Sequence, residues 1–146
     1  MITDTVTSFA RKEKGTKFQQ EILDKVLEQC SLLKKEDLQS CPASANSEDI
    51  RVRDGARQIF PFSIESKHLD TGFSKAYKTL EQAHTQMRNL GRADHIEPIA
   101  FIKEKDKEPL AVLSAEYAIW LFNLVSLLLK YGDLASPAVL KQERVE

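Results

Sequence analysis

The sequence has little cysteine and almost no net charge. It contains two cysteines among 146 residues, Cys30 and Cys41. Their number and spacing exclude a disulfide framework and a structural zinc site, so we predict reduced thiols in a reducing compartment. The formal net charge of −1 argues against a protein that coats nucleic acid indiscriminately. It still allows a local basic face, because electrostatic binding depends on where the charges lie.

Long apolar runs are also missing. Residues 1–17 are polar and lack the apolar segment of a secretory signal. The most apolar stretch, residues 117–129, is interrupted by Asn123 and Ser126. It is also shorter than the roughly 20 residues that a bilayer requires. We therefore predict a soluble cytoplasmic protein without a membrane segment.

What is present suits one globular domain. Hydrophobic residues make up 42% of the chain and charged residues 29%, which is ordinary for a soluble protein of this length. We predict a flexible N-terminus over residues 1–13, one domain over residues 14–132 and a C-terminal tail over residues 133–146.

The first half of the chain predicts a helix followed by a hairpin. An apolar stripe through Phe18, Ile22, Val26 and Cys30 has helical spacing, and Thr16 is a suitable N-cap. Residues 34–47 are polar and indicate a loop, with room for a short strand before Pro42.

The hairpin is predicted over residues 48–67. Ile50 and Val52 alternate with polar residues in its first arm, and Asp54-Gly55 is a turn signal. The second arm reads IFPFSIESK over residues 59–67.

The second half predicts a helix over residues 73–90, stopped by Gly91, then two strands over residues 98–102 and 110–113. A last helix follows over residues 115–131, with Ser114 as its N-cap. The whole order is that of an α/β protein. The last helix is apolar on nearly every side, so either the sheet and first helix enclose it or a second copy of the chain covers it.

The second hairpin arm carries the candidate chemistry. Phe60, Phe62 and Ile64 fall on the side expected to face the core. Glu65 and Lys67 leave on the opposite side, about 6–7 Å apart along an extended backbone. Such a pair by itself is weak evidence, since exposed strands often carry ion pairs.

A carboxylate on the other arm strengthens the pattern. Asp49 lies in the first arm, where it can approach Glu65 across the hairpin. Two carboxylates held together favour a cation between them, and hard oxygen ligands suit Mg²⁺. Adjacent side chains of a strand point to opposite faces, so we expect Asp49 rather than Glu48 to face this site.

These motifs resemble the PD-(D/E)XK nuclease superfamily. The matching residues are Lys14-Gly15, Glu48-Asp49-Ile50, Phe60-Pro61-Phe62 with Glu65 and Lys67, and Glu81-Gln82-Ala83. Within that superfamily the chain is similar to small phage-encoded endonucleases akin to Holliday-junction resolvases. The resemblance implies a restriction-endonuclease-like core, in which helices flank a central mixed β-sheet. It also implies a bacterial or phage-infected cell.

The resemblance also implies roles for individual residues. Asp49 and Glu65 would bind Mg²⁺, with Mn²⁺ able to substitute, the Ser66 carbonyl would be a further ligand, and Lys67 would be the catalytic lysine. Glu21 would assist the metal or the water, and Gln82 would hold the active-site network or the DNA backbone. For Glu21 and Gln82 a solvated helix position is the competing interpretation. Two positions depart from the family: Ser47 replaces a common glycine and Ser66 a frequent cysteine.

DNA contacts are predicted from residues near this site that are basic or can carry a proton. They are Lys14, Lys17, His68, Lys75, Lys78 and Arg88. Contacts from such side chains to phosphates carry no sequence information. A solvated helix face remains the alternative for each lysine.

The sequence thus predicts a Mg²⁺-dependent endonuclease acting on branched DNA, as in recombination. A homodimer formed through the helix over residues 115–131 would suit the two strands of a junction. A nuclease acting on ordinary duplex or single strands, and an inactive DNA-binding or assembly module, stay open as alternatives.

Overall fold

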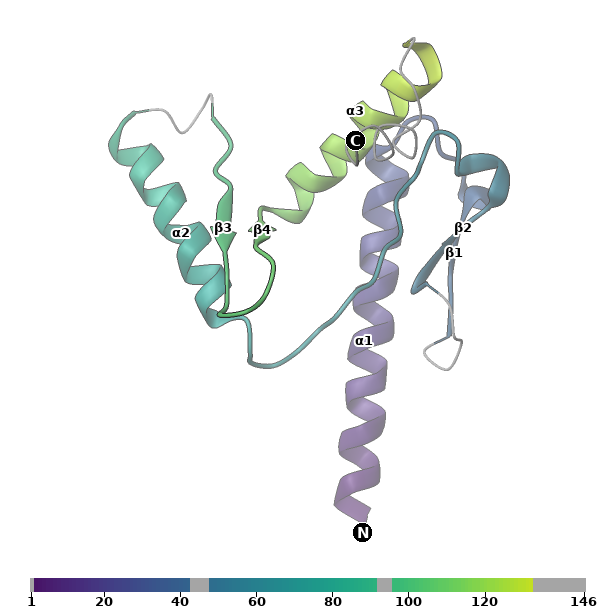
Figure 1. Ribbon diagram of the computed structural model, residues 1–146. Coiled ribbons are helices and arrows are strands. Elements are labelled where there is room, and N and C mark those ends of the chain that lie inside the picture. Colours follow the sequence, from purple (N-terminus) through teal and green to yellow (C-terminus); the bar gives the residue numbers. More distant parts are fainter. Residues whose placement is uncertain (1, 43–47, 92–95, 133–146) are drawn as a thin grey trace. The chain divides into compact units, whose positions relative to one another are not determined.

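The computed structural model describes residues 2–42, 48–91 and 96–132 (Figure 1). Its helices and strands are, in order, α1 (Ile2–Gln29), β1 (Leu38–Ser40), β2 (Ile50–Val52), α2 (Ser74–Asn89), β3 (Ala100–Ile102), β4 (Leu110–Val112) and α3 (Ala115–Tyr131). Two short 3₁₀ turns, Lys35–Asp37 and Asp54–Ala56, precede β1 and follow β2. The chain is a mixed α/β protein, as predicted.

The chain packs as two compact units. One comprises Met1–His68 with Ile119–Glu146, and the other comprises Leu69–Ala118. The predicted domain over residues 14–132 has parts in both units, and its unity stays a prediction. The predicted tail, residues 133–146, lies outside the described residues.

The first unit is built on the second half of α1. Its predicted stripe is confirmed, because Val26 and Cys30 are fully buried and Leu23 nearly so. Strands β1 and β2 pair antiparallel, with Ser40 opposite Ile50, and lie beside α1 (Figure 1). The short strand before Pro42 is therefore also confirmed.

Aromatic rings close this core. Phe60 is 0% exposed and meets Phe62 edge-on at 5.0 Å between ring centroids. Phe122 of α3 stacks on Phe62 at 4.3 Å and meets Phe60 edge-on at 5.7 Å. Ile64 packs against the same cluster. The prediction that Phe60, Phe62 and Ile64 face the core is confirmed.

The predicted start of the first helix is wrong. α1 begins at Ile2, and Thr16 lies inside it, where its hydroxyl donates to the Lys12 carbonyl (3.0 Å). The apolar stripe ends at Phe18, but residues 10–14, ARKEK, include good helix formers that extend the helix without burial. The predicted flexibility of residues 1–13 concerns motion and stays a prediction.

The predicted strand over residues 59–67 is reduced to one β-bridge, between Ile50 and Ile64. Side chains take the main-chain groups that a ladder would use. Arg57 donates to the Phe62 carbonyl (2.9 Å) and the Ser66 N–H donates to the Asp49 carboxylate (2.7 Å). Pro61 has no N–H to offer, so the segment is extended but only bridged.

The second unit matches the prediction closely. α2 ends before Gly91, which has φ +67°, and packs on β3 (Figure 1). Strands β3 and β4 pair antiparallel, with Phe101 opposite Ala111. The first turn of α3 is capped as predicted, because the Tyr117 N–H donates to the Ser114 hydroxyl (3.1 Å).

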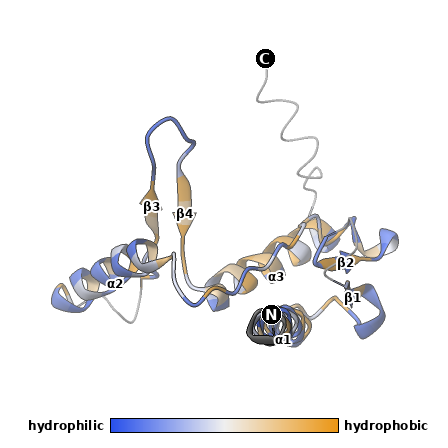
Figure 2. Ribbon diagram, turned by 90° about the horizontal axis from the view of Figure 1, so that it is seen from below, coloured by the Kyte–Doolittle hydropathy of each residue, from blue (hydrophilic) through white to orange (hydrophobic). Residues whose placement is uncertain are grey.

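α3 is apolar along nearly its whole length (Figure 2). Within the first unit Ile119 and Ser126 are buried, whereas Leu124 and Leu128 are 39% and 43% exposed. Enclosure by the first unit is therefore partial. None of the helices among the described residues combines the length and the apolar character needed to cross a membrane.

Over residues 2–42, 48–91 and 96–132 the strands form two separate two-stranded antiparallel sheets. The restriction-endonuclease-like core with one central mixed sheet stays a prediction.

Candidate functional site

The candidate site lies where the chain around Asp49 meets the chain around Ser66. The Asp49 Oδ2 atom accepts two hydrogen bonds from Ser66, one from its N–H (2.7 Å) and one from its hydroxyl (3.0 Å). One residue further along, the β-bridge joins Ile50 to Ile64. Asp49 and Ser66 lie 17 positions apart in the sequence, and their two segments are held together by both a side chain and the main chain.

Glu65 and Lys67 flank this contact in the sequence. Both are exposed, while Ile64 and Ser66 between and beside them are half-buried. The alternation puts the carboxylate and the ammonium on the solvent side of the extended segment, as predicted. The bonds of the Asp49 carboxylate go to Ser66, and no described hydrogen bond or ion pair joins Asp49 to Glu65 or Lys67.

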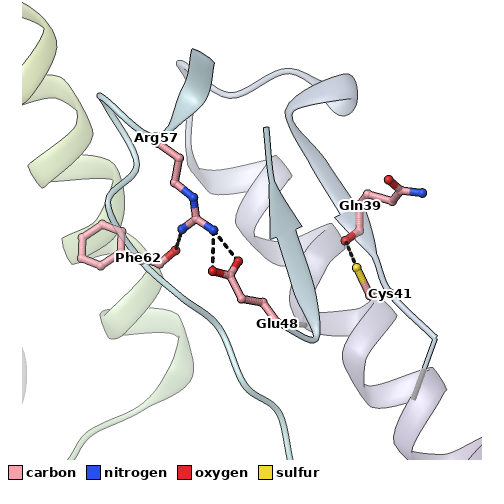
Figure 3. A network of polar contacts seen from close by, with 5 residues as sticks. All are labelled: Gln39, Cys41, Glu48, Arg57 and Phe62. Carbon is pink, nitrogen blue, oxygen red and sulfur yellow. Dashed lines mark hydrogen bonds and ion pairs between the residues drawn. The ribbon is translucent and has the colours of Figure 1, made fainter. Parts of the chain in front are cut away.

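Glu48 has a different partner, Arg57 (Figure 3). The Arg57 guanidinium contacts both oxygens of the Glu48 carboxylate, and its other terminal nitrogen donates to the Phe62 carbonyl (2.9 Å). Both side chains are about one-third exposed. Arg57 thus connects Glu48, just before β2, to the main chain of Phe62 in the extended segment. Glu48 is engaged by Arg57, and Asp49 is the carboxylate that contacts Ser66.

Gln19 of α1 also reaches the site and was not among the predicted residues. It is 6% exposed, and its Nε2 atom lies 2.8 Å from both the Ser40 hydroxyl and the Cys41 carbonyl. The same atom donates to the Asp49 carbonyl. Gln19 lies four residues before Leu23 on the buried stripe of the helix, so a polar residue on that stripe is the signal that could have found it.

Glu21, predicted to assist the metal, is exposed and pairs with Lys25 one turn along α1 (3.1 Å). Gln82, predicted to hold the network, is exposed on α2 beside Lys78 and Gln86. It belongs to the second unit, whereas Asp49, Glu65 and Lys67 belong to the first.

The predicted DNA contacts are all exposed side chains. Lys14, Lys17 and His68 belong to the first unit, where Lys17 pairs with Glu13 (2.8 Å) and the His68 ring lies 5.8 Å from that of Phe18. Lys75, Lys78 and Arg88 lie on α2 in the second unit.

The donor set suits a hard cation. Asp49, Glu65 and the Ser66 carbonyl offer only oxygen, the ligand atom that Mg²⁺ prefers. Within the described parts of the chain, no three histidine, cysteine, aspartate or glutamate side chains gather as a metal-binding group. The fit therefore rests on two carboxylates and main-chain oxygen rather than on a closed cage, which is usual for Mg²⁺ because it keeps several waters.

Comparison with protein-family models, with curated proteins and with solved structures gives no match to this chain.

Proposed function

We propose that the chain is a Mg²⁺-dependent DNA endonuclease with a restriction-endonuclease-like core, acting on branched or otherwise structured DNA. The observation that supports the proposal is the pair of hydrogen bonds from Ser66 to the Asp49 carboxylate. This contact holds the Asp49 carboxylate against the residue that lies between Glu65 and Lys67 in the sequence.

In this proposal Asp49, Glu65 and the Ser66 carbonyl hold the metal ion. Bound Mg²⁺ supplies Lewis-acid chemistry, polarising a phosphoryl oxygen and lowering the pKa of a bound water. Lys67 orients the attacking water and offsets negative charge on the phosphate as it develops. Phe60 and Phe62 anchor the segment in the core, so that Glu65 and Lys67 project from a fixed backbone.

The test is cleavage of a four-way junction, a linear duplex and a single strand with and without Mg²⁺. We expect Glu65→Ala and Lys67→Ala each to slow cleavage about 100- to 1000-fold, the range for loss of one group that stabilises a transition state. Glu104→Ala and Lys107→Ala are matched controls, because these two side chains are also exposed and pair with each other on a turn (2.5 Å). The controls should cut at the wild-type rate.

The substrates separate the alternatives. Paired symmetric cuts in the junction support junction resolution, and cutting of all three DNAs supports a general nuclease. Absence of Mg²⁺-dependent cutting, or equal cutting by wild type and both site variants, overturns the enzymatic proposal and favours a binding or assembly module.

A further inference from the structure

Gln19 is the most deeply buried polar side chain that reaches the candidate site. Its amide nitrogen faces three acceptors that belong to Ser40, Cys41 and Asp49. A primary amide has two N–H donors, so the three oxygens share two hydrogens. These acceptors lie at the end of the β1–β2 ladder, where the chain leaves β1 and enters β2.

The Asp49 carbonyl has two donors at this point. Besides Gln19 it accepts from the Cys41 N–H (2.9 Å). The bond from Cys41 continues the ladder of two short strands, and the bond from Gln19 ties that ladder to α1. The main chain of Asp49 is therefore fixed by Cys41 and Gln19, while its carboxylate is fixed by Ser66.

We propose that Gln19 is a positioning residue, which holds the main chain of Asp49 so that its carboxylate points at Ser66. The importance of this role for catalysis rests on the proposed function, in which Asp49 binds metal. The positioning itself is a property of the fold and can be measured without any reaction.

The chemistry of the amide explains why other side chains would fail here. Leucine has similar size but no donor, so it would leave the part-buried carbonyl groups of Cys41 and Asp49 with fewer partners. Ionised glutamate would present an oxygen to three oxygens and would be repelled. Without the Gln19 donor the Asp49 carbonyl keeps a single partner, the Cys41 N–H, so the main chain of Asp49 should be held less firmly.

The experiment is residue-resolved hydrogen exchange on the full chain without metal. The reporter is the Ser66 amide, which donates to Asp49, and the reference is the Arg53 amide, which donates to the Asp37 carbonyl (2.9 Å) in the same unit. The ratio of their protection factors removes any change in overall stability. Leu23→Ala is the matched control, since Leu23 lies on the same face of α1 and is also 6% exposed.

In Gln19→Leu we expect the protection factor of the Ser66 amide, relative to that of the Arg53 amide, to fall about tenfold. This is the change expected for loss of one hydrogen bond to a charged group. Asp49→Ala should lower it at least as far, and Leu23→Ala should leave the ratio unchanged. An unchanged ratio in Gln19→Leu overturns the proposal, and so does a Ser66 amide that is no better protected in wild type than in Asp49→Ala.

A second readout connects the residue to catalysis. If the chain cuts DNA with Mg²⁺, Gln19→Leu should need more Mg²⁺ for half-maximal cutting, whereas Leu23→Ala should not. If wild type cuts no DNA, the proposed function fails, and the exchange ratio still decides the positioning role of Gln19.

Discussion

At the scale of single residues, the buried polar side chains of the described residues are all hydrogen-bonded. Asp37 is 5% exposed and accepts from the Lys34 N–H (2.8 Å) and from the Arg53 guanidinium (2.6 Å). Among the described residues, every buried side-chain nitrogen and oxygen has a hydrogen-bond partner. The first unit thus avoids the cost of about 1–3 kcal/mol for each unsatisfied buried group.

The buried thiol of Cys30 predicts a pH effect on stability. Burial raises the pKa of the Cys30 thiol from 9.0 to about 11. The unfolded chain therefore loses this proton at a lower pH than the folded chain does, so stability falls as the pH rises from about 9 to about 11. The total loss is at most about 3 kcal/mol, from roughly 1.4 kcal/mol for each pKa unit.

Urea unfolding of wild type and Cys30→Ala between pH 8 and pH 11 measures this effect. Cys30→Ala should be less stable at pH 8, because it leaves a cavity, and the difference should narrow as the pH rises. A difference that stays constant over the whole range would contradict the predicted linkage.

At the scale of helices and strands, the features that depend on neighbouring residues could be predicted better than those that depend on distant ones. The bounds of α3 follow from Ser114 at its start and Gly132 after its end, both of which act on neighbouring residues. The burial of Phe60 follows from simple alternation. Such features can be predicted from the sequence because the residues that cause them lie within a few positions of each other.

The parts that could not be predicted depend on contacts between distant residues. Two hydrogen bonds replace ladder bonds: one from Arg57 to the Phe62 carbonyl and one from the Ser66 N–H to the Asp49 carboxylate. The spacing of apolar residues in the sequence does not indicate either of them. The amide of Gln19 acts across 30 residues to reach Asp49. The residue types of the candidate site could be predicted, but the contacts that hold them could not.

Two glycines give opposite predictions for the same substitution. Gly15 lies inside α1 with open space where a Cβ would lie, so Gly15→Ala should stabilise the helix by about 1 kcal/mol. Gly91 follows α2 at φ +67°, where Gly91→Ala should cost about 1–2 kcal/mol because a side chain disfavours that conformation. Thermal or urea unfolding monitored by circular dichroism measures both, and shifts of the same sign would refute the argument.

At the scale of the whole molecule, the exposed apolar face of α3 raises the question of what covers it. We expect a homodimer at micromolar concentration, formed through Leu124 and Leu128 of two copies. Glu substitutions at both positions should give a monomer, because they place charge in an apolar interface. Leu110→Glu is the control, since Leu110 is an exposed leucine of β4. A wild-type chain that light scattering finds monomeric would refute the dimer.

The exposed basic side chains predict salt-sensitive DNA binding, although the formal net charge of the whole molecule is −1. If Lys14, Lys17, Lys75, Lys78 and Arg88 each contact a phosphate, the logarithm of affinity should fall against the logarithm of salt with a slope of about −4.5. Lys75→Ala should reduce the slope by about 1, and Lys105→Ala, on the exposed turn after β3, should not. A slope near zero would exclude phosphate contacts as the source of affinity.

The length of α1 has a consequence for how the chain responds to its surroundings. The helix has 28 residues, which corresponds to about 42 Å, yet every side chain from Thr7 to Lys14 is exposed. Burial secures the second half of the helix, whereas the first half depends on helix–coil equilibrium, which is marginal for short segments in water. We therefore expect two melting regimes in this one helix: gradual fraying from the N-terminus on warming, and cooperative unfolding of the remainder with the core. A bound phosphate backbone along Lys14 and Lys17 would extend the ordered part, so that DNA binding and helix formation would become coupled.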